Sequence, residues 1–142
     1  MNKTLNILLF SWIFLLSASG CVNKSIPFET LAEGDQSLVN TESFIIINDQ
    51  DQFLDVWKSL SYQSGPPTID FSKKTVIAVF MGTQGSTGYE IGIDKIIEYD
   101  DRIEVRVSYH SPSDFELTVL TSPFHIVLTE KLTKPVSFKI EY

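Results

Sequence analysis

The sequence VIAVFMGTQGSTGYEIGI, from Val76 to Ile93, contains two segments of different pattern joined by a loop with three glycines. The first segment is apolar at nearly every position, which predicts a strand buried on both faces. The last segment alternates apolar and polar residues, which predicts a strand with one buried face. Gly82, Gly85 and Gly88 indicate backbone angles that other residues avoid, or a partner that approaches the backbone closely. If the protein has a working surface, we expect it at this loop.

Further strands are predicted on both sides of this stretch, at residues 43–47, 103–109, 117–129 and 136–142. A short acidic turn separates the alternating segments before and after it, which predicts a β-hairpin. The alternation slips at Lys95, because Ile96 and Ile97 are adjacent, and we interpret this slip as a β-bulge. Pro123 cannot donate to a strand ladder, so the strand that contains it is expected to be interrupted at an edge or a bulge.

One amphipathic helix is predicted after the first of these strands. Phe53, Val56, Trp57 and Leu60 recur at helical spacing, and Asn48 is suited to be the N-cap. We interpret the apolar stripe as core packing against a sheet. The predicted fold class is α+β: an antiparallel-rich curled sheet, or a small β-sandwich or barrel, with one packed helix.

The composition fits one globular domain. The chain has 142 residues, of which 43% are hydrophobic, and this is enough apolar material for a core. The formal net charge is −7. An acidic chain without a cluster of Lys and Arg cannot neutralise phosphates, so we expect no nucleic-acid binding.

The N-terminus has the pattern of a bacterial lipoprotein signal. Lys3 precedes an apolar core at Leu5–Leu16, and small residues lead directly to Cys21, the single cysteine. Ala18-Ser19-Gly20 before this cysteine resembles the lipobox, which implies that Cys21 carries lipid. We therefore expect a signal peptide at 1–20, a polar tether at 21–40 and one domain at 41–142. The predicted location is extracytoplasmic, lipid-anchored to the outer membrane or the cell surface; an ordinary signal peptide or an uncleaved anchor are the alternatives.

Residue patterns of catalysis are absent from the sequence. His110 and His125 lie on different predicted strands, without carboxylates or cysteine at metal-ligand spacing, so each is expected to be an exposed or half-buried strand residue. The glycine loop leads into a strand, whereas phosphate-binding loops lead into a helix N-terminus. We expect no enzyme activity, no metal and no cofactor.

Two segments have residue types suited to protein contact. Ser86-Thr87-Gly88-Tyr89 places hydroxyl groups and a tyrosine at the start of a strand, and Thr121-Ser122-Pro123-Phe124 is an irregular point on another strand. Alternatively, Gly88 only permits a bulge and Tyr89 only begins the inward-facing stripe. The candidate protein-binding residues are Gly85, Ser86, Thr87, Gly88, Tyr89, Thr121, Ser122 and Pro123.

These segments, together with Trp57 and Asp70-Phe71-Ser72, resemble the PrcB family, named after a lipoprotein subunit of a secreted protease complex. The resemblance covers roughly residues 44–140. Thr87-Gly88-Tyr89 matches the family's Thr-Gly-Gly-Tyr with one glycine displaced to Gly85, and Phe124 stands where the family usually has tyrosine. The resemblance implies a non-catalytic accessory subunit that binds a secreted subtilisin-like protease or another envelope protein.

Two other functions are compatible with the sequence. Ser86-Thr87-Gly88-Tyr89 is also similar to a loop of chagasin-type cysteine-peptidase inhibitors, although the companion loops of that family have no match here. The third possibility is a structural envelope lipoprotein without a protease partner.

Overall fold

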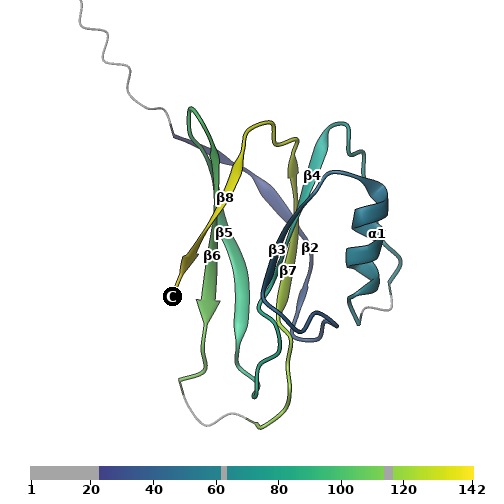
Figure 1. Ribbon diagram of the computed structural model, residues 1–142, viewed down its shortest axis with the longest axis vertical. Helices are drawn as coiled ribbons and strands as arrows, with labels where there is room; N and C mark the ends of the chain where they lie inside the picture. Colours follow the sequence, from purple (N-terminus) through teal and green to yellow (C-terminus); the bar gives the residue numbers. More distant parts are fainter. Residues whose placement is uncertain (1–22, 62–63, 114–116) are drawn as a thin grey trace, which may run out of the picture.

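In the part of the chain that the structure describes, two four-stranded sheets pack face to face, and one helix covers the outer face of one of them (Figure 1). The computed structural model describes residues 23–61, 64–113 and 117–142. The first sheet has the order β1 (Lys24–Ile26), β5 (Glu90–Glu98), β6 (Ile103–His110) and β8 (Val136–Glu141). The second has the order β2 (Phe28–Gly34), β7 (Phe124–Glu130), β4 (Lys74–Phe80) and β3 (Ser43–Ile47). Helix α1 spans Gln50–Lys58.

This arrangement confirms the predicted α+β class and selects the sandwich among the predicted forms, since the sheets do not close into a barrel. All neighbouring strands are antiparallel except β6 and β8, which run parallel. The hairpin of β5 and β6 is as predicted. Its register shifts between Ile93 and Lys95, where the sequence predicts a bulge.

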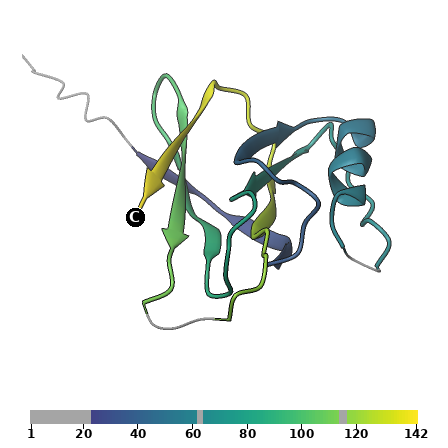
Figure 2. The ribbon, with the colours of Figure 1, turned by 60° about the horizontal axis from the view of Figure 1, so that its bottom comes forward.

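Strand β4 is buried on both faces, as its apolar pattern predicts. One face joins the core between the two sheets, where Ile77 and Val79 contact residues of β5 and β6. The other face joins the core under the helix, where Val76, Ala78 and Phe80 cluster with helix residues. Figure 2 shows α1 on the far side of the second sheet from β5 and β6.

The helix packs as its periodicity predicts, but it begins one residue later. Phe53 and Trp57 are buried against the second sheet, and Leu60 follows the end of α1. Asp49, not Asn48, is the N-cap, because its carboxylate accepts the N–H of Gln52 at 2.8 Å. The Asn48 side chain instead accepts hydrogen bonds from Lys131, which follows β7, and from Thr75 of β4.

The polar tether predicted for residues 21–40 is wrong over most of its described length, because residues 24–34 form β1 and β2. These two strands are separated only by Pro27. β1 pairs with β5 of the first sheet and β2 with β7 of the second, so one extended segment belongs to both sheets (Figure 1). A register shift between Thr30 and Ala32 interrupts the alternation of β2, which explains why this strand looks aperiodic in sequence.

The strand predicted at 117–129 is shorter than expected. Residues 117–120 have no strand structure, Thr121 and Ser122 form isolated bridges, and β7 begins at Phe124. Pro123 therefore marks the start of the strand rather than an interruption within it.

The predicted signal peptide and Cys21 lie outside the described residues. Within the described ranges, no helix is long and apolar enough to cross a membrane.

Candidate functional site

The two segments that the sequence singles out lie side by side at one end of the sandwich. Gln84 and Thr121 exchange backbone hydrogen bonds of 2.7 and 3.1 Å, and the N–H of Thr87 donates to the carbonyl of Leu117 at 3.1 Å. We call residues 84–89 together with residues 117–123 the loop pair. It lies at the lower end of the sandwich in Figure 1.

The second segment of the loop pair is mostly interior. Thr121, Ser122 and Pro123 are buried. The Thr121 hydroxyl donates to the carbonyl of Ser86 at 2.9 Å, and the carbonyl of Pro123 accepts the N–H of Met81 at 3.0 Å. The Thr121 contact holds the first segment in place, and the Pro123 contact ties the second segment to Met81 at the end of β4. Other side chains form the surface of the loop pair.

Two glycines determine the backbone path into β5. Gly82 has φ 78°, and a Cβ there would lie 2.9 Å from the backbone nitrogen of Glu42. Gly88 has φ 85°, a conformation that L side chains rarely adopt. Gly85 faces open space and has no positive φ, so this glycine is not required by local geometry.

The outer surface of the loop pair is apolar. Leu117, Val119 and Leu120 have relative exposures of 67%, 49% and 69%. Tyr89 is half-buried at the entrance to β5. Exposed apolar side chains that gather on one short segment are candidates for contact with a partner.

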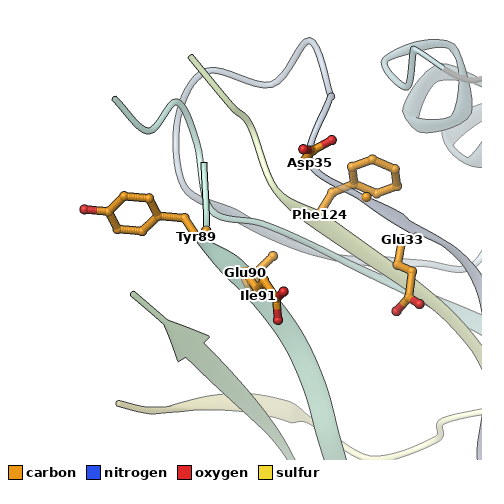
Figure 3. Close-up of a pocket in the computed structure, with 8 residues that line it drawn as sticks. Glu33, Asp35, Tyr89, Glu90, Ile91 and Phe124 are labelled. Atoms are coloured by element: carbon orange, nitrogen blue, oxygen red, sulfur yellow. The ribbon is translucent and has the colours of Figure 1, made fainter. Parts of the chain in front are cut away.

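A groove of about 410 Å³ opens beside the loop pair, between the start of β5 and the end of β2 (Figure 3). Tyr89, Glu90 and Ile91 line it from the β5 side, and the opposite side is formed by β2 and the residue that follows it. Phe124 of β7 also lines the groove. In Figure 3 the Tyr89 ring points away from Phe124, so the two aromatic rings do not close the groove.

Three carboxylates give the groove a negative charge. Glu33 ends β2 with Gly34, Asp35 follows directly, and Glu90 begins β5. In the described parts of the chain, no Lys or Arg forms an ion pair with these three residues. The imidazole Nε2 of His125 lies 3.8 Å from a Glu33 oxygen.

His125 joins the two sheets behind this groove. Its Nδ1 accepts the backbone N–H of Ile93 at 2.9 Å, so Nδ1 carries no proton. The proton of the neutral ring therefore lies on Nε2, which donates to the Thr30 hydroxyl at 2.8 Å. Burial lowers the pKa of His125 and outweighs the opposing influence of Glu33 and Asp94, so the ring is neutral at neutral pH.

This burial corrects the prediction that His125 is exposed or half-buried, since its relative exposure is 6%. The direction of the hydrogen bond between His125 and Thr30 also bears on whether His125 can act as a base. A histidine that activates a hydroxyl nucleophile must accept the proton of that hydroxyl, whereas Nε2 donates to Thr30. His110, by contrast, is exposed at the end of β6. In the described ranges, no three His, Cys, Asp or Glu side chains gather closely enough to hold a metal ion.

The sequence identifies part of this region and misses part. It singles out Gly88 and Tyr89, which line the groove. It misses Glu33 and Asp35, because they fall within the predicted tether. The apolar pair Leu31 and Ala32 beside polar residues is the feature that could have predicted β2. The bulge between Thr30 and Ala32 breaks the alternation, so the strand is not recognisable in the sequence.

The fold and the site define a small α+β sandwich domain with an acidic groove beside an apolar loop pair. Residues 75–130, from β4 through β7, match the family model described as PrcB C-terminal. The matched range includes both segments of the loop pair; Trp57 and Asp70-Phe71-Ser72 precede it. The comparisons with curated proteins and with solved structures gave no match.

Proposed function

We propose that this protein is a non-catalytic accessory subunit that binds a secreted subtilisin-like protease through the loop pair. The match of residues 75–130 to the PrcB C-terminal family model is compatible with such a role. The family resemblance suggests a secreted protease as the partner, and the loop pair is the surface that we expect the partner to contact.

The observation that carries this proposal is the exposure of Leu117, Val119 and Leu120 on a segment held by hydrogen bonds to residues 84–87. A rigid backbone that presents apolar side chains loses little conformational entropy when a partner covers them. Burial of three such side chains is favourable by several kcal/mol (about 1.5–3 kcal/mol for each fully buried Leu or Val).

The non-catalytic role is supported by the chemistry of His125. Its Nε2 donates to Thr30 and its Nδ1 is occupied by a backbone donor, so this imidazole has no free basic nitrogen for a reaction.

We also propose that Cys21 carries a lipid that anchors the protein to the outer membrane or the cell surface. The small residues Ala18-Ser19-Gly20 before this cysteine support the anchor. A secreted protease bound to the loop pair would then be retained at the cell envelope.

The test is affinity purification of the full chain from native membranes through a tag placed after Tyr142, whose side chain is exposed. Captured proteins are treated with a fluorophosphonate, which labels the nucleophilic serine of active serine proteases. We expect a labelled protease with the wild-type chain. The L117S/V119S/L120S variant should reduce its recovery at least about tenfold, because an apolar contact is lost.

The matched control is L117M/V119I/L120M, which keeps the surface apolar and should retain the protease. Absence of a labelled protease from the wild-type sample, or equal recovery with the serine variant, would overturn the proposal. The purified chain is also assayed against papain and subtilisin. Submicromolar inhibition of papain would favour the chagasin-like alternative over the accessory subunit.

A further inference from the structure

The edge of β5 is only partly covered. β1 pairs with β5 at Ile96–Glu98, near the end of that strand. Over the described ranges, no strand pairs with residues 90–93 on the side opposite β6. The uncovered part of this edge faces the groove beside the loop pair, and Ile91 lines that groove.

The backbone groups at this edge are directed toward the groove. The N–H of Ile93 bonds to His125 and therefore points away from β6. In an antiparallel ladder, residues two apart direct their N–H and C=O groups to the same side. The N–H and C=O of Ile91 thus face the groove, where a further strand can pair with them.

The side chains that line the groove indicate the composition of an added strand that would bind there. Glu33 and Asp35 on one side and Glu90 on the other supply three carboxylates without a Lys or Arg partner in the described parts of the chain. Phe124 and Ile91 also line the groove, and since their relative exposures are 2% and 7%, they supply a small apolar area between the carboxylates. An extended chain that alternates basic and apolar side chains complements both features, because alternate residues of a strand face opposite directions.

We propose that the groove binds an extended segment rich in Lys or Arg, which adds as a strand to the free edge of β5. This inference rests on the proposed function in one respect: the segment belongs to the partner protein that the accessory subunit binds. Backbone hydrogen bonds to Ile91 supply affinity, and the three carboxylates supply the preference for basic side chains.

The probes are three fluorescein-labelled, acetylated and amidated octapeptides, tested by fluorescence anisotropy with the detergent-solubilised full chain. The first alternates valine and lysine, the second alternates valine and glutamate, and the third is the valine–lysine peptide with N-methyl groups at alternate residues. We expect the valine–lysine peptide to bind, with weakening at higher salt. The glutamate peptide and the N-methylated peptide should each bind at least about tenfold more weakly.

The groove variant is E33Q/D35N/E90Q, which removes the three charges with little change in side-chain size. It should weaken the valine–lysine peptide about tenfold. The matched control is E29Q/D51N/D100N, which removes three exposed carboxylates that do not line the groove, and it should bind as the wild type does.

Equal binding of the N-methylated and unmodified peptides would overturn strand addition and leave only charge adsorption. If the groove variant and the matched control weaken binding of the valine–lysine peptide equally, the groove is not the binding site. These outcomes are separable from failure of the proposed function. If protease capture is lost with L117S/V119S/L120S but retained with E33Q/D35N/E90Q, the loop pair is supported as the protease-binding surface and the groove is rejected. If the peptide binds but no protease is captured, the groove is supported as a peptide site and the proposed function is rejected.

Discussion

Ile93 of β5 donates its backbone N–H to Nδ1 of His125 on β7 over 2.9 Å, and this hydrogen bond links the two sheets beyond the point where β1 leaves β5. A neutral imidazole can accept this bond, whereas a protonated one cannot, because both of its nitrogens are then donors. The stability of the sandwich is therefore linked to the protonation of one side chain.

The first prediction concerns pH. The pKa of His125 is lowered by burial, so the unfolded state binds more protons than the folded state below the ordinary histidine value of about 6.5. The free energy of unfolding should therefore fall as the pH drops from about 6.5, by at most about 1.4 kcal/mol per pH unit from this group. H125N should reduce that slope, measured by urea denaturation at several pH values. H110N, at an exposed position, is the matched control, and a slope unaffected by H125N would contradict the prediction.

The second prediction concerns two glycines of the same loop. G82A should destabilise the protein by about 2 kcal/mol or more, because φ is positive and the added Cβ would contact the backbone of residues 40–42. G85A should change the free energy of unfolding by less than about 0.5 kcal/mol, because nothing lies within 4 Å of its Cβ. If G82A and G85A lower the free energy of unfolding equally in thermal or urea denaturation, this account of Gly82 is incorrect.

The third prediction concerns the hydrogen bond that joins the two segments of the loop pair. T121V keeps the side-chain shape but leaves the Ser86 carbonyl without the Thr121 donor, at a buried position. We expect a loss of about 1–2 kcal/mol in the free energy of unfolding. T133V, at an exposed position between β7 and β8, is the matched control and should change stability by less than about 0.5 kcal/mol.

The fourth prediction concerns the anchor proposed at Cys21. C21S should move the protein from the membrane fraction to the soluble fraction and abolish labelling with radioactive palmitate. The reason is that acyl chains on the cysteine supply the burial that holds the protein on the bilayer. Membrane association of C21S equal to that of the wild type would reject lipidation as the anchor.

The elements that the sequence predicts well are those whose pattern is local. The apolar run of β4, the alternation of β5 and β6, and the slip near Lys95 each follow from residues close together in the chain. The helix stripe of Phe53 and Trp57 is likewise local, since residues four apart on a helix share a face.

The elements that it misses depend on distant residues. The parallel pairing of β6 with β8 leaves no mark on the sequence of either strand. β2 is hidden because Pro27 precedes it and a bulge breaks its period. Glu33 and Glu90 line opposite sides of the same groove, although they are 57 positions apart in the sequence. The periodicity of a single strand cannot predict that two such distant residues line one groove.

The shared N-terminal strand has a practical consequence for the smallest unit that folds on its own. A recombinant chain that begins at Thr41 would lack one edge of each sheet, the buried side chains of Ile26 and Ala32, and the Thr30 hydroxyl that His125 contacts. The minimal domain therefore begins at or before Lys24. Lys24 lies three positions after Cys21, a span of at most about 11 Å. A lipid on Cys21 would thus hold the sandwich almost against the bilayer surface, with β1 as the strand nearest the membrane.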